Sequence, residues 1–89
     1  MVTYKIVYTK KAIKDIKNLK SAGIEKKAKM LVELIKQNPY QTPPYYEKLQ
    51  GELKGAYSRR INIQHRLVYE VFEKEKIIKI ISLWSHYEF

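Results

Sequence analysis

Apolar and polar residues alternate along the start of the chain, which predicts a β-strand over residues 2–8. These residues are mostly of the β-branched and aromatic types that strands favour. The spacing of apolar residues then changes to three and four, as on one face of an α-helix, at Ala12, Ile13, Ile16 and Leu19. Thr9 is a suitable N-cap for this helix, and Ser21-Ala22-Gly23 predicts its end.

A second amphipathic helix is predicted by an apolar stripe at Ile24, Ala28, Leu31, Leu34 and Ile35. It should end before Asn38-Pro39, because the residue before a proline avoids helical dihedral angles. The lysines between the apolar positions are typical of the solvated face of such a helix. We therefore expect two helices packed antiparallel.

The rest of the chain predicts a long connection followed by strands. Residues 38–56 contain three prolines and two glycines and are expected to form a loop. Strand-like runs follow near 57–63, 66–73 and 76–84, with gaps short enough for hairpins at Gln64-His65 and Lys74-Glu75.

This order of elements, β-α-α-β-β-β, predicts an α+β fold in which two N-terminal helices pack on one face of an antiparallel sheet. The opposite face of the sheet could be left open. The 89 residues are enough for one domain, which we expect to span residues 1–89.

Charge narrows the range of partners. The 18 lysines and arginines outnumber the 9 acidic residues, which gives a net charge of +9, and the sequence pI is about 9.7. Such a surface favours nucleic acid or an acidic protein as a partner. All three arginines lie in the second half of the chain, where their forked donors suit phosphate.

Several classes of protein are disfavoured. The chain has no cysteine, so neither a disulfide framework nor a thiolate metal site is expected. No apolar stretch suits a signal peptide or a membrane span. No cluster of His, Asp and Glu has metal-ligand spacing. We expect a cytoplasmic protein without a cofactor or metal.

Four short segments form a specific combination: Glu47-Lys48-Leu49, Ser58-Arg59-Arg60, His65-Arg66-Leu67-Val68-Tyr69 and His86-Tyr87. Together they resemble the YoeB/Txe family of bacterial toxins, within the wider RelE-like superfamily. The resemblance is detailed in the carboxy-terminal half and extends to the first half in the order of elements. It implies a RelE-like fold.

The resemblance also implies an activity and partners. Members of this family enter the ribosomal A site and cut messenger RNA there, and a separately encoded antitoxin, of the YefM/Axe type, keeps them silent. The expected antitoxin is acidic, and the sequence leaves open whether the free protein is a homodimer. By the family motif, Glu47 matches the general base, His86 the general acid, and Arg66 the residue that holds the scissile phosphate. Tyr87 matches the tyrosine that positions the substrate.

These roles fit metal-free RNA cleavage, which needs a base for the 2′-hydroxyl, an acid for the leaving oxygen and cations for the transition state. Further RNA contacts are expected from Lys48, Lys54, Arg59 and Arg60. Arg59, together with Ser58, could also position the loop of the site, with Arg60 facing the other side of the strand. His65 is expected to orient its neighbours.

Three features depart from the family pattern. Gln50 stands where relatives often have a lysine that contacts phosphate, and Glu88-Phe89 extends the chain beyond the terminal tyrosine. The third is the pair of aromatic residues Tyr57 and Trp84, which we expect to pack in the sheet. Because Gln50 replaces that lysine, a further hypothesis stays open, in which this chain is a degenerate family member that acts only as a protein partner.

Two alternative interpretations also stay open, one for the role of Arg66 and one for the function of the protein. Arg66 could form an ion pair with Glu70 on the same face of its strand. The protein could also be a non-catalytic RNA-binding domain whose aromatic residues stack on bases, namely Tyr45, Tyr46, Tyr57 and Trp84.

Overall fold

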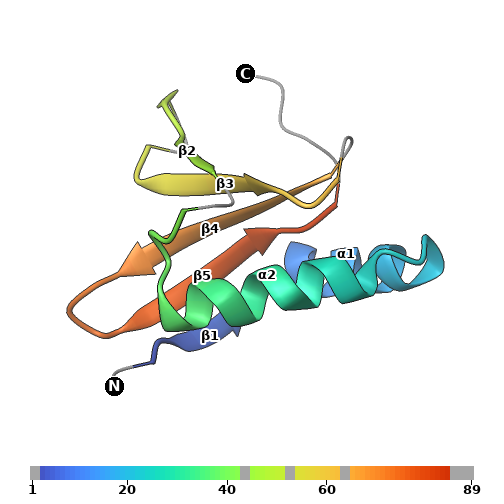
Figure 1. Ribbon diagram of the computed structural model, residues 1–89, viewed down its shortest axis with the longest axis horizontal. Helices are drawn as coiled ribbons and strands as arrows, with labels where there is room; N and C mark the ends of the chain where they lie inside the picture. The colour runs from blue at the N-terminus through green and yellow to red at the C-terminus, as the bar shows by residue number, and fades with distance from the viewer. Residues whose placement is uncertain (1–2, 43–44, 52–53, 63–64, 85–89) are drawn as a thin grey trace.

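The computed structural model describes residues 3–42, 45–51, 54–62 and 65–84. Two helices cover one face of a five-stranded sheet (Figure 1). In chain order the elements are β1 (Lys5–Tyr8), α1 (Lys10–Ser21), α2 (Glu25–Gln37), β2 (Tyr46–Lys48), β3 (Ala56–Arg60), β4 (Arg66–Phe72) and β5 (Ile77–Ser82). The α+β architecture with two N-terminal helices on a sheet is confirmed.

The strands lie in the order β1-β5-β4-β3-β2. The pairs among β2, β3, β4 and β5 are antiparallel, whereas β1 runs parallel to β5. The expectation of an entirely antiparallel sheet was therefore wrong at one edge. The two helices carry the chain across the sheet after β1, and such a crossover permits parallel pairing.

The prediction of a loop over residues 38–56 was also incomplete, because this segment contains β2. Three residues are too few to produce a recognisable alternation of apolar and polar types. The strand exists because β3 offers it a hydrogen-bonding edge, with Glu47 opposite Ser58. Pairing with a partner far along the chain, and not a local pattern, creates this strand.

Helix α1 begins as predicted, since the hydroxyl of Thr9 accepts a hydrogen bond from the backbone N–H of Ala12 at 3.1 Å. The predicted apolar face is only partly correct. Ile13 is 52% exposed, whereas Asp15 is buried. Successive residues of a helix differ by about 100° in direction, so the face that packs Ala12 against the sheet turns Ile13 toward solvent.

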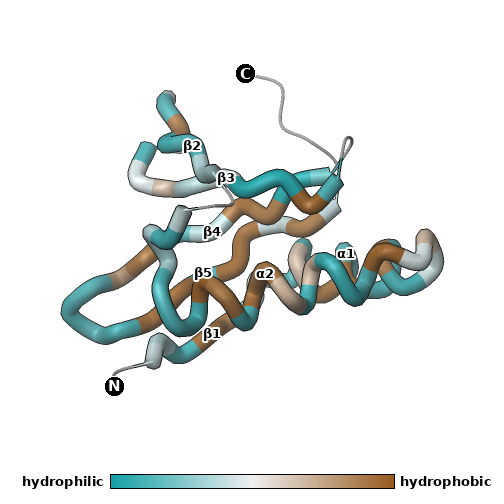
Figure 2. Tube along the Cα trace, viewed as in Figure 1, coloured by the Kyte–Doolittle hydropathy of each residue, from teal (hydrophilic) through white to brown (hydrophobic). Residues whose placement is uncertain are grey.

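The main core lies between the helices and the sheet. It joins buried residues of all these layers, namely Ala12, Leu19, Ala28, Val32, Ile35, Ile61, Leu67, Tyr69, Ile78, Ile80 and Leu83. Figure 2 shows the corresponding pattern, with hydrophobic positions along β5 and an alternation of hydrophobic and hydrophilic positions along α2. Removal of these apolar side chains from water is the main force that holds the helices on the sheet.

A second, smaller cluster joins Leu49, Ala56 and Val68, with Ile81 packed against it. Ala56 and Val68 lie on strands whose alternate residues, Tyr57 and Tyr69, face the helices. Since neighbours in a strand point to opposite faces, the small cluster lies on the face away from the helices. It attaches the end of β2 to the sheet.

No helix in the described part of the chain is long and apolar enough to cross a membrane.

Candidate functional site

Glu47 and Arg66 lie on different strands, and the sheet brings their charged groups together. Glu47 on β2 lies opposite Ser58 on β3, and Arg66 on β4 lies opposite Arg60 on β3. An oxygen of the Glu47 carboxylate, Oε2, lies 3.5 Å from Nη1 of Arg66. The alternative pairing of Arg66 with Glu70 is not the contact that forms, because four residues of extended strand span about 13 Å.

The pair borders an open hollow on the face of the sheet away from the helices. The hollow has a volume of about 300 Å³ and is lined by Tyr45, Glu47, Ser58, Arg60 and Arg66. The side chain of Glu47 is 69% exposed and that of Arg66 is 29% exposed. Such a solvated ion pair contributes little to stability, so both groups remain available to a ligand.

The two neighbouring arginines of β3 point to opposite faces of the sheet. Arg60 is exposed and lines the hollow, whereas Arg59 is completely buried. The expectation that Arg60 faces away from the site was therefore wrong. The expected RNA contact of Arg59 was wrong as well, because a side chain enclosed by protein cannot reach a phosphate.

The two lysines expected to contact RNA lie outside the hollow. Lys48 is exposed and lies opposite Tyr57, and it follows Glu47 in the same strand, so its side chain leaves β2 on the other face. Lys54 is exposed and lies in the turn that leads into β3. Neither lysine lines the hollow, and their contact with RNA stays a prediction.

The two remaining predicted residues, His86 and Tyr87, lie outside the described part of the chain. Immediately before that part ends, Trp84 stacks on His65. Trp84 also packs against the main core, in agreement with its expected packing role. The orienting role expected for His65 is consistent with this stack.

Two residues important for the geometry were missed in the sequence. The buried carboxylate of Asp15 accepts hydrogen bonds from the backbone N–H groups of Leu83 at 3.0 Å and Trp84 at 3.3 Å, and from Lys11 Nζ at 3.0 Å. Tyr69 is completely buried and shares its hydroxyl between Arg59 and Pro39. A single Asp in a lysine-rich helix was the only local signal for the first of these contacts.

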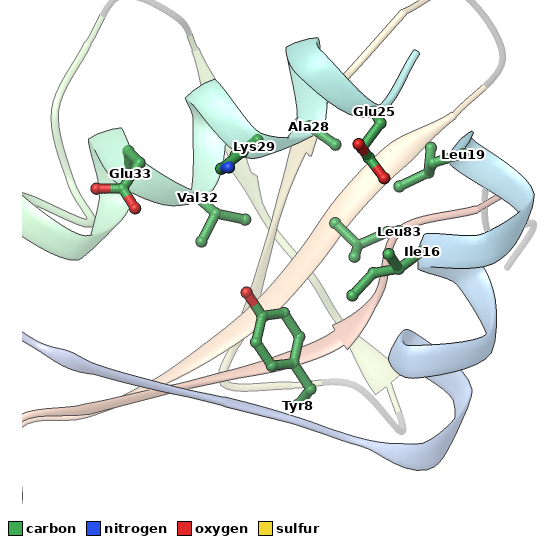
Figure 3. A pocket seen from close by; sticks show the side chains of 9 residues that line it. All are labelled: Tyr8, Ile16, Leu19, Glu25, Ala28, Lys29, Val32, Glu33 and Leu83. Carbon is green, nitrogen blue, oxygen red and sulfur yellow. The ribbon is translucent and has the colours of Figure 1, made fainter. Parts of the chain in front are cut away.

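A second hollow, also of about 300 Å³, lies on the helical side of the molecule. Figure 3 shows its apolar lining, with Ile16, Leu19 and Leu83 close together, and Glu33 and Lys29 on the helix above Tyr8. Burial raises the pKa of the Tyr8 phenol, and the nearby charge of Glu33 raises it further. This hollow lacks the grouped arginines of the first.

A carboxylate beside two guanidinium groups can do specific chemistry. The guanidinium groups of Arg60 and Arg66 can bind an anion such as a phosphodiester. The carboxylate of Glu47 can then accept a proton from a hydroxyl that is bound next to that anion. Among the described residues, no group of three or more His, Asp or Glu side chains could hold a metal ion.

The chain is similar in sequence to known proteins. Residues 8–87 match a family model described as the YoeB-like toxin of bacterial type II toxin-antitoxin systems. The toxin YoeB of Synechocystis is 36% identical over 63 residues, which cover 71% of each chain. The toxin YoeB of Mycobacterium bovis is 39% identical over 57 residues, which cover 64% of this chain and 65% of the relative.

Solved structures agree. A YoeB/ParE toxin from Agrobacterium tumefaciens superposes with a TM-score of 0.85 at 29% identity, over 93% of this chain and 99% of the other. A chain of the YoeB-YefM complex from Staphylococcus aureus gives a TM-score of 0.79 at 36% identity, over 97% and 100%. These matches confirm the expected RelE-like fold and the resemblance to YoeB. With the family model covering nearly the whole chain, this protein belongs to the YoeB-like toxins of bacterial type II toxin-antitoxin systems.

Proposed function

We propose that this toxin is a ribosome-dependent endoribonuclease that cuts messenger RNA in the A site without a metal ion and so inhibits translation. The observation that carries the proposal is the contact between the Glu47 carboxylate and the Arg66 guanidinium in an open, arginine-lined hollow. A binding surface for RNA phosphates alone gains nothing from a carboxylate at that place, because the carboxylate repels phosphate.

The proposed reaction assigns one step to each group. Glu47 takes the proton of the 2′-hydroxyl, and that oxygen attacks the adjacent phosphorus while the bond from phosphorus to the 5′-oxygen breaks. Arg66, assisted by Arg60, stabilises the extra negative charge on the phosphate oxygens. His86 returns a proton to the leaving 5′-oxygen, and Tyr87 positions the substrate. The products are a 2′,3′-cyclic phosphate and a 5′-hydroxyl.

We also propose that an acidic antitoxin neutralises this chain. The support comes from the family, since a relative from Staphylococcus aureus has been solved as a YoeB-YefM complex, and from the net charge of +9. An acidic chain would be attracted to such a surface over distances of about a Debye length.

The test is mapped cleavage of a defined messenger RNA on programmed ribosomes, with naked RNA as a control. Wild-type protein should cut within the A-site codon, and Glu47→Gln and His86→Ala should each lower the rate by roughly 10² to 10⁴. Glu70→Gln is a matched control, because Glu70 is a carboxylate on the same face of the sheet that does not line the hollow.

Binding separates this proposal from a purely RNA-binding protein. Glu47→Gln should bind ribosomes as tightly as the wild type while it fails to cut. If wild-type protein bound tightly and made no cut, the enzymatic proposal would be wrong and the binding module would replace it.

A further inference from the structure

The buried side chain of Arg59 is an unexpected feature of a basic protein whose other charged groups mostly face water. A buried guanidinium loses its hydration, and this loss is costly unless its donors are satisfied. Its Nε donates to the hydroxyl of Tyr69 at 3.0 Å, and one Nη donates to the backbone carbonyl of Pro39 at 2.9 Å. The Tyr69 hydroxyl also donates to the Pro39 carbonyl, at 2.7 Å.

These three groups form a closed triangle that joins distant parts of the chain. Arg59 lies on β3, Tyr69 lies on β4, and Pro39 lies in the connection between α2 and β2. Both donors converge on one carbonyl oxygen, so the start of that connection is fixed to the middle of the sheet. We call this set of three residues the Arg59 triangle.

The Arg59 triangle also contacts β2 directly. The guanidinium carbon of Arg59 lies 5.0 Å from the centre of the Tyr46 ring, within the range of a cation–π interaction. Tyr46 lies opposite Arg59 in the pairing of β2 with β3. β2 is therefore fixed on the face toward the helices by Tyr46. On the opposite face, which carries Glu47, the Leu49 cluster fixes it.

Glu47 follows Tyr46 immediately and points to the other face of the sheet, toward Arg66. Any change in the twist or register of β2 would move the carboxylate away from the guanidinium, since a strand of three residues has few other constraints. We infer that the Arg59 triangle is a positioning device for Glu47, through which buried residues that cannot touch RNA set the rate of cleavage. This inference rests on the proposed function, because it assigns to Glu47 the role of base.

The most selective variant is Tyr69→Phe, which removes one hydroxyl and keeps the ring in the core. It leaves Arg59 Nε without this acceptor and takes one of the two donors from the Pro39 carbonyl. Tyr4→Phe is the matched control. It also removes a tyrosine hydroxyl that donates a hydrogen bond, in this case to Glu73, but Tyr4 lies next to β1, at the edge of the sheet opposite β2.

The first readout is the single-turnover rate of cleavage on programmed ribosomes. Tyr69→Phe should lower this rate roughly 10-fold, the loss that corresponds to one buried hydrogen bond, without weakening ribosome binding. Tyr4→Phe should leave the rate unchanged. In a Glu47→Gln background, Tyr69→Phe should cause no further loss, because residues that act through one group are not additive.

The second readout does not depend on activity. The backbone N–H of Leu49 donates to the carbonyl of Ala56 at 3.0 Å, next to β2. Its hydrogen exchange should become about 10-fold faster in Tyr69→Phe, while amides at the centre of β5 keep their protection.

The outcomes separate the two proposals. If the wild type did not cut RNA but Leu49 exchange rose selectively, the proposed function would fail and the positioning of β2 would stand. If Tyr69→Phe cut RNA at the wild-type rate, or lowered the rate equally in the Glu47→Gln background, the Arg59 triangle would be a structural element only. Unchanged exchange at Leu49 would overturn the inference.

Discussion

The imidazole ring of His65 lies on the indole ring of Trp84, with the ring centres 4.0 Å apart and the ring planes 17° from parallel. His65 directly precedes β4, and Trp84 lies shortly after β5. The stack therefore joins the ends of two adjacent strands at the point where the chain leaves the sheet. It also identifies Trp84 as a packing residue, with one face covered by protein.

His65→Ala should lower the free energy of unfolding by about 1 kcal/mol, the typical contribution of a stacked aromatic pair. His65→Phe should retain most of that contribution, because a second aromatic ring can occupy the same place. Urea unfolding of the three proteins measures the difference. Equal midpoints for the wild type and the alanine variant would show that the stack adds nothing to stability.

Arg66→Ala should lower the cleavage rate roughly 10² to 10³-fold, as expected for the loss of one donor to the transition state. Arg66→Lys should recover only part of this loss, because an ammonium group lacks the planar fork that fits phosphate. Single-turnover kinetics on ribosomes measure both effects. Lys14→Ala, on the exposed side of α1, controls for the change in net charge and should cut normally; an equal loss in Lys14→Ala would assign the effect to overall charge.

Ser58→Ala should separate stability from activity. Among the described residues, neither Ser58 Oγ nor Ser82 Oγ has a hydrogen-bond partner, although both are buried. An unsatisfied buried hydroxyl costs about 1 to 3 kcal/mol, so both alanine variants should be at least as stable as the wild type. Ser58 borders the hollow, but its buried hydroxyl cannot reach a phosphate, so neither variant should lower cleavage.

The two serine variants need both measurements. Thermal unfolding should give melting temperatures at or above that of the wild type, and the cleavage rate should stay constant for both variants. A clear loss of stability in Ser58→Ala would mean that its hydroxyl is already satisfied in the folded protein.

Glu73 should make stability depend on acid pH. Its carboxylate accepts hydrogen bonds from Tyr40 at 2.8 Å, from Lys76 at 3.1 Å and from Tyr4 at 3.0 Å. These bonds, that of Tyr40 first, hold the pKa of Glu73 below its usual value of 4.5. The unfolded chain therefore binds the proton more readily, so the contribution of Glu73 is complete above pH 4.5 and is lost as the pH falls below it.

Urea midpoints measured across this acid range should fall less steeply for Glu73→Gln than for the wild type. Glu75→Gln, in the same turn between β4 and β5, controls for the removal of one carboxylate. Parallel acid profiles for the wild type and Glu73→Gln would show that the three hydrogen bonds do not affect the titration.

Binding of the antitoxin should weaken strongly with salt. Between about 0.1 M and about 1 M salt the Debye length falls from about 10 Å to about 3 Å, and the attraction of an acidic chain to a surface of net charge +9 is screened accordingly. Titration calorimetry with the purified antitoxin over this range measures the change. An affinity that did not vary with salt would mean that apolar contacts dominate the complex.

The helices show how far local patterns determine structure. The N-cap at Thr9 and the end of α2 before Asn38-Pro39 were correctly predicted, because caps and prolines act on the neighbouring backbone. The exposure of Ile13 was missed, since the rotation of α1 about its axis depends on its packing against β5. β2 was missed for the related reason that its pairing partner lies outside the local sequence.

The candidate site divides in the same way. The residue types and their order along the chain indicated the family to which the protein belongs, and they drew attention to Glu47 and Arg66, whose side chains the sheet brings into contact. The sequence by itself thus determined which reactive side chains are available. It also determined the two helices and most of the strands. It did not distinguish Arg59 from Arg60, which are identical in type and adjacent.

Only the tertiary structure decided that Arg60 faces the hollow and Arg59 the core. Side chains alternate between the faces of a strand, so a shift of one residue in register would exchange the two arginines. The register of β3 is set by contacts with β2 and β4, including Glu47 opposite Ser58 and Tyr57 opposite Tyr69. These contacts join residues far apart in the chain, and for this reason the assembly of the site is a property of the folded sheet.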